Sequence, residues 1–146
     1  MRVFIDTNIL ISTIINSNST PAKAFFKALA FPHQGLISTE VIRELNDVFN
    51  RKFPDKVVLL KPFITLAAYN LIIIQTQKEV IPEENLIRDE KDKPILRAAI
   101  QGKADILLTG DKDFLESGIT HPMIMTAAQF LLQENLLSAA VDSIYH

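Results

Sequence analysis

The chain has 146 residues, enough for one domain with a substantial hydrophobic core and too few for two ordinary domains. Hydrophobic residues make up 48% of it and charged residues 22%, a composition that excludes a disordered chain. With no cysteine the chain forms neither disulfides nor thiolate metal sites, and its net charge of −2 gives no sign of the basic surface common in nucleic-acid-binding proteins.

Short apolar runs rich in β-branched residues predict the strands. The first run, residues 2–6, is apolar between Arg2 and Asp6, so we expect a strand covered on both faces, with no leader segment before it. Further runs predict strands at 35–38, 71–74, 105–109 and, more briefly, 123–125. Segments with helical spacing alternate with these strands, at 7–15, 22–31, 39–52, 55–70, 93–102 and 127–137.

The alternation of strands and helices predicts an α/β protein with a central parallel sheet of four to five strands flanked by helices. We expect a single domain over residues 1–146, with its core at about 2–132 and a tail at 138–146. No apolar run approaches the roughly 18 residues of a membrane span, so no membrane association is expected.

Two segments carry local signals that bear on this outline. Pro62 stands inside the predicted helix at 55–70 and is expected to kink or divide it. The polar, highly charged stretch at 77–93 is interpreted as a solvated connection.

Four carboxylates are candidate site residues: Asp6, Glu44, Asp92 and Asp111. Asp6 closes the first strand and Asp111 follows the strand at 105–109, so in one parallel sheet both would lie at the edge where the carboxyl ends of strands meet. Acids brought together there repel each other unless a cation lies between them. The sequence therefore predicts a metal site at this edge of the sheet.

Each of these acids also has an ordinary structural explanation. Asp6 fits an N-cap, Glu44 fits a surface ion pair, and the other two fit a helix start and a Gly-Asp turn. Within its helix, Glu44 is preferred to Glu40 because it lies at the edge of the apolar stripe centred near Leu45, whereas Glu40 is expected further round towards solvent.

Four segments form a pattern: Phe-Ile-Asp-Thr-Asn at 4–8, a helical Glu44, Arg-Asp-Glu-Lys-Asp at 88–92, and Ala-Asp-Ile-Leu-Leu-Thr-Gly-Asp-Lys-Asp-Phe-Leu at 104–115. This pattern resembles the PIN-domain ribonucleases, and most closely their VapC-related branch, the toxin components of toxin–antitoxin systems. The resemblance covers residues 2 to about 132. It departs from the family in the middle motif, where Glu90 replaces a frequent proline.

By this resemblance the four candidate carboxylates, Asp6, Glu44, Asp92 and Asp111, match the family's acidic positions. Additional candidates are Asn8, Asp89, Thr109 and Asp113. Asp89 and Asp113 are acids often seen in this branch, and Asn8 would orient a carboxylate or a water through hydrogen bonds.

The resemblance implies a metal-dependent endoribonuclease. Oxygen-only ligands favour Mg²⁺ or Mn²⁺. We expect Asp6 and Asp92 to hold the principal ion, and Glu44 and Asp111 to complete the site, bind a second ion or orient the attacking water. The resemblance also implies a toxin of the prokaryotic cytoplasm, commonly a homodimer, that a small antitoxin protein neutralises. RNA as the substrate rests on the resemblance alone.

Other interpretations use the same residues. A haloacid-dehalogenase-like phosphatase needs a second Asp where the chain has Asn8, and a phosphoacceptor receiver domain needs an acidic pair near Asp6. A non-catalytic PIN-fold interaction module stays open as the alternative. The apolar segment 127–141 is expected to pack on the core, with a homodimer surface or an antitoxin groove as its other uses. Candidates for guiding a phosphate backbone are Lys23, Lys27, Arg43, Arg51, Lys52 and Lys112.

Overall fold

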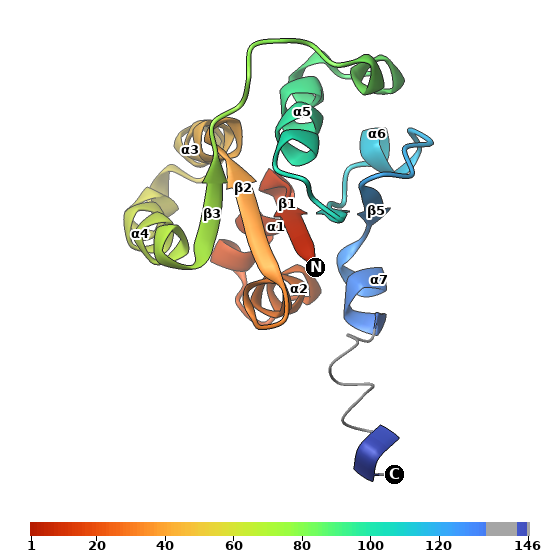
Figure 1. Cartoon of the computed structure of the whole chain (residues 1–146). Coiled ribbons are helices and arrows are strands. Elements are labelled where there is room, and N and C mark those ends of the chain that lie inside the picture. The colour runs from red at the N-terminus through yellow and green to blue at the C-terminus, as the bar shows by residue number, and fades with distance from the viewer. Residues whose placement is uncertain (134–142, 146) are drawn as a thin grey trace.

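A sheet of five parallel strands forms the centre of the protein in the computed structural model, which describes residues 1–133 and 143–145 (Figure 1). Across the sheet the strands are β3 (Leu71–Ile74), β2 (Gln34–Ser38), β1 (Arg2–Ile5), β4 (Ile106–Leu108) and β5 (Met123–Met125). Every pair of neighbouring strands is parallel. The predicted α/β class and the five predicted strands are confirmed.

Helices connect these strands. The α-helices are α1 (Thr7–Ile15), α2 (Thr20–Leu29), α3 (Thr39–Lys52), α4 (Leu60–Asn70), α5 (Lys93–Gln101), α6 (Lys112–Leu115) and α7 (Ala127–Leu132). Short 3₁₀ helices are η1 (Pro54–Leu59), η2 (Pro82–Leu86) and η3 (Glu90–Asp92). Among the residues that the structure describes, no helix has both the length and the apolar character needed to cross a membrane.

The order of the strands creates a switch point between β1 and β4. The chain runs outward from β1 through β2 to β3, then crosses back to β4 on the other side of β1. Right-handed crossovers in opposite directions place helices on opposite faces of a sheet, and Figure 1 shows α5 on the other side of the sheet from α1. In open α/β sheets, sites form at such a point, outside the carboxyl ends of the strands.

The two central strands are covered on both faces, as the apolar run at 2–6 predicts. Val3, Phe4 and Ile5 are fully buried on β1, and the three residues of β4 are buried beside them. On the α5 side the helix approaches the sheet closely at Gly102, where a Cβ atom would lie only 2.9 Å from Leu36 Cδ2. The core therefore fixes the end of β1 and the end of β4 relative to each other.

The predicted helix at 55–70 is divided, but two residues before Pro62 rather than at it. The helix η1 ends at Leu59, and α4 begins at Leu60. Because Pro62 has no N–H, it cannot donate to the carbonyl of Val58, and the division places it in the first turn of α4, where that bond is not needed.

The stretch at 77–93 is mostly exposed, as its charge predicts, but it is also fastened to α5. Glu84 in η2 is buried, and its carboxylate accepts two hydrogen bonds from the Arg97 guanidinium of α5, at 2.7 and 3.0 Å. Gln101 of α5 hydrogen-bonds the backbone of 75–77 in both directions, at 3.0 and 2.9 Å. These contacts fasten the crossover segment to α5. The sequence interpretation missed them because the partners lie 13 or more residues apart.

The helix α7 packs against α2, and this contact corrects one predicted role. Phe130 of α7 is fully buried, and Lys27 of α2 donates from Nζ to the carbonyls of Phe130 and Gln133. Lys27 thus fastens α7 instead of guiding a substrate. The helix predicted at 127–137 ends at Leu132, and residues 134–142, with much of the predicted tail at 138–146, lie outside the described residues.

Candidate metal centre

Asp6 stands directly after β1 with its carboxylate buried. Its Oδ1 accepts a hydrogen bond from the backbone N–H of Thr7 at 2.8 Å, which confirms the predicted N-cap of α1. Its Oδ2 accepts from the Thr109 hydroxyl at 2.7 Å and from the Asn8 side-chain amide at 3.5 Å. Thr109 follows β4, so the carboxylate of Asp6 lies at the switch point, held by residues from both strands.

Asp111 reaches the same place from β4. Its backbone N–H donates to the Thr109 hydroxyl at 3.0 Å, and the neighbouring Gly110 N–H donates to the Asn8 side-chain oxygen at 3.3 Å. Its Oδ1 caps α6 by accepting from the Asp113 N–H at 2.9 Å. Thr109 and Asn8 therefore join the turn after β4 to the turn after β1.

Asp92 brings a third carboxylate, from the opposite face of the sheet. It occupies the N-cap position of α5, yet its side chain makes no capping hydrogen bond there. The side chain is buried, and its Oδ2 has no hydrogen-bond partner among the residues that the structure describes. In contrast, Asp89 and Asp111 each use one oxygen to cap a following helix. The Asp92 side chain is thus buried, with one carboxylate oxygen that accepts no hydrogen bond from the described residues.

The acids interact strongly with one another. Burial raises the pKa of Asp92 to about 8, and repulsion from Asp111, Asp6 and Asp89 adds to this effect. Burial also raises the pKa of Asp6 to about 6, against the hydrogen bonds that it accepts, with repulsion from Glu44 and Asp111 as further causes. The four predicted carboxylates therefore form one electrostatic cluster at the switch point, but of the four only Asp92 belongs to a group of acids that the described residues place at metal-ligand spacing.

Glu44 joins this cluster from α3 and lies at its exposed rim. Desolvation beside the other acids raises its pKa, and repulsion from Asp111 adds to the rise. The hydroxyl of Thr7 and the ammonium of Lys91 act in the opposite direction, since both favour the ionised carboxylate. Glu44 is thus a residue of α3 whose carboxylate interacts electrostatically with the other acids of the cluster.

The prediction that Glu40 faces solvent is wrong. Glu40 is half-buried, and its Oε2 accepts hydrogen bonds from the hydroxyls of Thr39 at 2.9 Å and Thr76 at 2.8 Å. Thr76 belongs to the segment after β3, a partner that helical periodicity cannot reveal. These bonds give the carboxylate a structural role, tying α3 to the start of the crossover segment.

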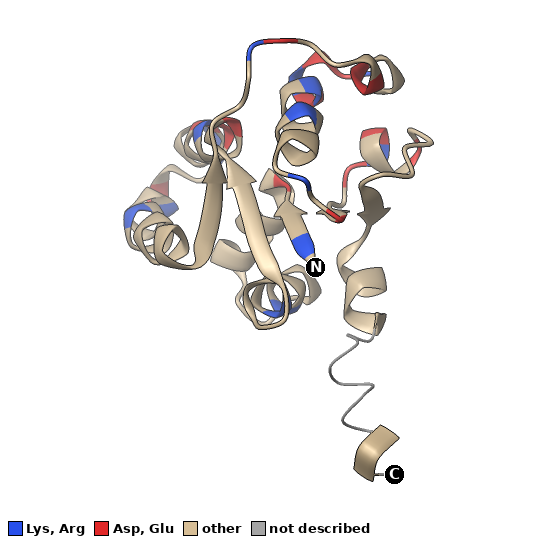
Figure 2. Ribbon diagram, in the orientation of Figure 1, with Lys and Arg blue, Asp and Glu red and all other residues tan. Residues whose placement is uncertain are grey.

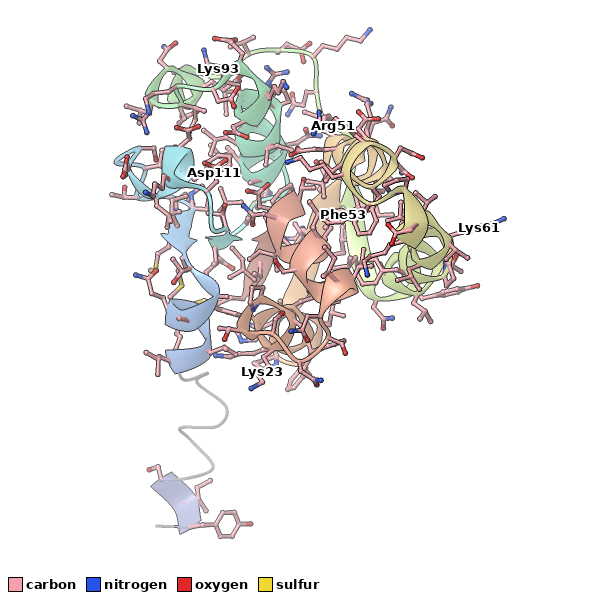
Figure 3. The ribbon with its side chains drawn as sticks, turned by 180° about the vertical axis from the view of Figure 1, so that it is seen from behind. Lys23, Arg51, Phe53, Lys61, Lys93 and Asp111 are labelled. Atoms are coloured by element: carbon pink, nitrogen blue, oxygen red, sulfur yellow. The ribbon has the colours of Figure 1, made fainter. Side chains whose placement is uncertain are left out.

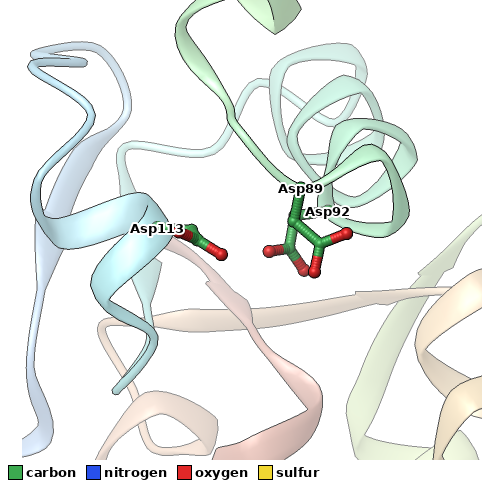
Figure 4. A group of neighbouring side chains, drawn as sticks. All are labelled: Asp89, Asp92 and Asp113. Atoms are coloured by element: carbon green, nitrogen blue, oxygen red, sulfur yellow. The ribbon is translucent and has the colours of Figure 1, made fainter.

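Asp89 and Asp113, the two additional acids, also approach Asp92. One carboxylate oxygen from each of the three lies within 4.8 Å of the others. Figure 4 shows Asp113 on α6 pointing across to Asp89 and Asp92 on the opposite segment. A group of this size matches oxygen ligands placed around one cation at about 2.0–2.6 Å.

One buried oxygen atom tests whether the residues fit a metal ion. Asp92 Oδ2 is buried without a hydrogen-bond partner in the described part of the chain. A buried polar atom without a partner is costly, and a cation or its bound water would remove that cost. The remaining donors are carboxylates, with no sulfur and no imidazole in the cluster. The residues therefore fit a hard divalent ion.

The raised pKa of Asp92 predicts that the metal-free protein loses stability as the pH rises. The folded state holds this proton up to about pH 8, whereas an unfolded Asp titrates near pH 4. The stabilisation is fully present below about pH 4 and is progressively lost as the pH rises to about 8. Urea unfolding in EDTA should show this dependence on pH, and Asp92→Asn should flatten it. If the unfolding free energy of the two proteins depends on pH with the same slope, the raised pKa of Asp92 is contradicted.

Basic side chains lie on one flank of the cluster. A groove of about 360 Å³ is lined by three basic residues, Arg43, Arg51 and Lys91, and by three acids, Glu40, Glu44 and Asp47. Lys91 was not among the predicted guides because it belongs to the charged segment interpreted as solvated. Figure 2 shows acidic residues on the segment before α5 and on α6, whereas α7 carries no charged residue.

The other residues predicted to guide a phosphate backbone lie at different distances from the cluster. Lys112 directly follows Asp111 and is exposed beside the cluster. Lys52 is exposed at the end of α3 and does not line the groove. Lys23 lies at the end of the molecule away from Asp111 and Lys93 (Figure 3), so it is remote from the cluster.

A sequence profile of the PIN domain matches residues 2–113. The chain belongs to the PIN-domain family. The PIN-domain match extends from β1 into α6 and includes each predicted acid from Asp6 to Asp113. The family that the sequence pattern predicts is therefore confirmed.

Known proteins resemble this PIN domain in sequence and in fold. The uncharacterized protein MJ1680 of Methanocaldococcus jannaschii is 28% identical over 120 residues, which are 79% of this chain and 74% of that protein. The structure of VapBC-1 from nontypeable Haemophilus influenzae has a TM-score of 0.64 and 16% identity, covering 88% of this chain and 99% of that chain. VapC20 of Mycobacterium tuberculosis, described as a sarcin–ricin loop cleaving toxin, has a TM-score of 0.58 and 16% identity, covering 81% and 96%. At these identities, the two solved structures support the fold.

Proposed function

We propose that this PIN domain is a Mg²⁺- or Mn²⁺-dependent endoribonuclease that hydrolyses RNA phosphodiester bonds. The observation that carries the proposal is the carboxylate cluster at the switch point, with Asp92 buried and one of its oxygens without a partner. A protein that uses these acids only for structure would pair them or expose them. Family membership supports the proposal, because the matched segment includes all of these acids.

In this mechanism the acidic residues of the protein hold the metal ion and orient the attacking water. Asp6 and Asp92 would hold the principal ion, and Glu44 and Asp111 would complete the site or orient the attacking water. A bound divalent ion would activate that water and offset the charge on the leaving oxygen. The hydrogen bonds from Thr7 and Thr109 hold the Asp6 carboxylate in one orientation, so no reorganisation is needed during reaction.

RNA as the substrate and toxicity as the biological role are parts of the same proposal. They are supported by the VapC-like sequence pattern and by the likeness to VapC20, described as a sarcin–ricin loop cleaving toxin. We further propose that the protein acts in the prokaryotic cytoplasm, as a homodimer that a small antitoxin protein neutralises. Light scattering of the purified protein tests the dimer, with a monomer mass contradicting it.

The decisive experiment is cleavage of a mixed RNA pool with Mn²⁺, with and without EDTA, followed by mapping of the new ends. We expect cleavage with Mn²⁺ and none with excess EDTA, because an empty acidic cluster repels a polyanionic substrate. The non-catalytic alternative predicts intact RNA in both samples. Calorimetric titration with Mn²⁺ separates the alternatives further, since a module without a working site would bind no ion.

A further inference from the structure

Arg88 connects the two sides of the acidic cluster. It precedes Asp89, and its side chain crosses to α6, where Nη2 lies 3.0 Å from Asp113 Oδ1 and 3.2 Å from Glu116 Oε2. Asp113 is one of the three acids whose oxygens lie within 4.8 Å of one another. Arg88 thus lies at the mouth of the proposed metal centre. It is not one of the basic residues that the sequence analysis selected.

Most of the hydrogen-bonding capacity of Arg88 is unused. Both ion pairs involve Nη2, and within the described residues neither Nε nor Nη1 donates to a protein acceptor. The side chain is 68% exposed, and the Glu116 side chain is 60% exposed. Ion pairs at such exposure are weak, because water competes for both partners. A stronger anionic partner would therefore displace these carboxylates from the Arg88 guanidinium.

A divalent ion and an RNA strand would change the partners of Arg88. The ion would compete with Arg88 for the Asp113 carboxylate. A phosphate on that ion would then bring two anionic oxygens to the mouth of the centre. The planar guanidinium matches such a pair of oxygens and binds them through parallel N–H groups.

We propose that Arg88 is a substrate-binding residue, which exchanges its carboxylate partners for the non-bridging oxygens of an RNA phosphate when the metal centre is filled. This inference rests on the proposed ribonuclease function and names a residue that contacts the substrate. The fastening of the crossover segment by Glu84, Arg97 and Gln101 supports it, because the backbone that carries Arg88 is already ordered before RNA binds.

The test uses the full chain with its proposed metal ligands intact and a fluorescent single-stranded RNA oligonucleotide with Mn²⁺, mixed rapidly so that binding is measured before cleavage. Introducing Arg88→Gln should weaken RNA binding by about tenfold or more. The plot of log affinity against log salt should become less steep by about 0.7, the loss of one phosphate contact on single-stranded RNA. Arg88→Lys keeps the charge but not the planar fork, so it should recover only part of the affinity.

Two controls separate substrate binding from a structural role. Lys61→Gln removes one charge from an exposed residue of α4, which Figure 3 shows on a different side from Asp111, and should leave RNA affinity within twofold. Glu116→Gln releases Arg88 from one partner and should leave RNA binding unchanged or tighter. Calorimetry should give Arg88→Gln an unchanged or higher affinity for Mn²⁺, because a competing cation leaves Asp113. A role limited to fastening α6 predicts weaker Mn²⁺ binding instead.

RNA affinity of Arg88→Gln equal to that of the Lys61→Gln control would overturn this proposal alone. So would a loss of RNA affinity in Glu116→Gln as large as that in Arg88→Gln, since both would then report a broken contact within the protein. Failure of the wild type to bind RNA, together with its failure to cleave RNA, would overturn the ribonuclease proposal and this one with it.

Discussion

Replacing Asp6 by Asn should reduce RNA cleavage by a factor of about a thousand or more, comparable to the loss of a preorganised charged group at other catalytic centres. The change removes one buried negative charge and keeps the shape of the side chain. The Thr7 N–H and the Thr109 hydroxyl would still bind the amide, so the turn after β1 should persist. Initial rates on a defined RNA with Mn²⁺ measure the effect.

Stability distinguishes a chemical loss from a folding defect in this variant. Burial raises the pKa of Asp6 to about 6, so above that pH its ionised carboxylate destabilises the metal-free protein. Asp6→Asn should therefore unfold at the same or a higher temperature than the wild type in EDTA at pH 8. Asp55→Asn, at an exposed position in η1, is the matched control and should change neither rate nor stability. Full cleavage by Asp6→Asn would contradict the mechanism.

The sequence could predict the meeting of Asp6 and Asp111 because it depends only on strand order and direction. Apolar runs identify β1 and β4 as buried strands, and parallel strands bring their carboxyl ends to one edge. Asp92 follows from the same logic, since β3 ends at that edge and the crossover helix α5 starts near it before running back to the beginning of β4. The cluster was therefore accessible from local patterns and topology.

Side-chain partners that lie far apart in the sequence could not be predicted in this way. Periodicity placed Glu40 towards solvent, yet a threonine from the segment after β3 covers it. Lys27 was predicted as a candidate for guiding a phosphate backbone, but it binds carbonyls about 100 residues later, at the end of α7. Periodicity describes one element at a time, whereas these contacts depend on how elements pack. The contacts of Arg88 with Asp113 and Glu116 could not be predicted for the same reason.

The second large effect is expected outside the cluster, at the buried ion pair of Glu84 and Arg97. Glu84→Gln should destabilise the protein by about 3–5 kcal/mol, because it leaves the largely buried Arg97 guanidinium without its paired carboxylate. The corresponding fall in unfolding temperature is roughly 10 °C for a domain of this size. Urea unfolding in EDTA near pH 7 measures the free energy, and Glu83→Gln, an exposed neighbour in η2, is the matched control.

A double variant decides whether the unpaired charge causes this loss. Glu84→Leu with Arg97→Met removes both charges together, and such replacements of buried pairs are often neutral or stabilising. It should therefore recover most of the stability lost in Glu84→Gln. If the double variant is no more stable than Glu84→Gln, the hydrogen bonds to the backbone of 77–81, and not the ion pair, hold the crossover segment. Equal stability of Glu84→Gln and Glu83→Gln would show that the ion pair contributes nothing.

Because this segment leads into Asp89 and Asp92, the affinity for Mn²⁺ should fall in Glu84→Gln and recover in the double variant, in parallel with stability.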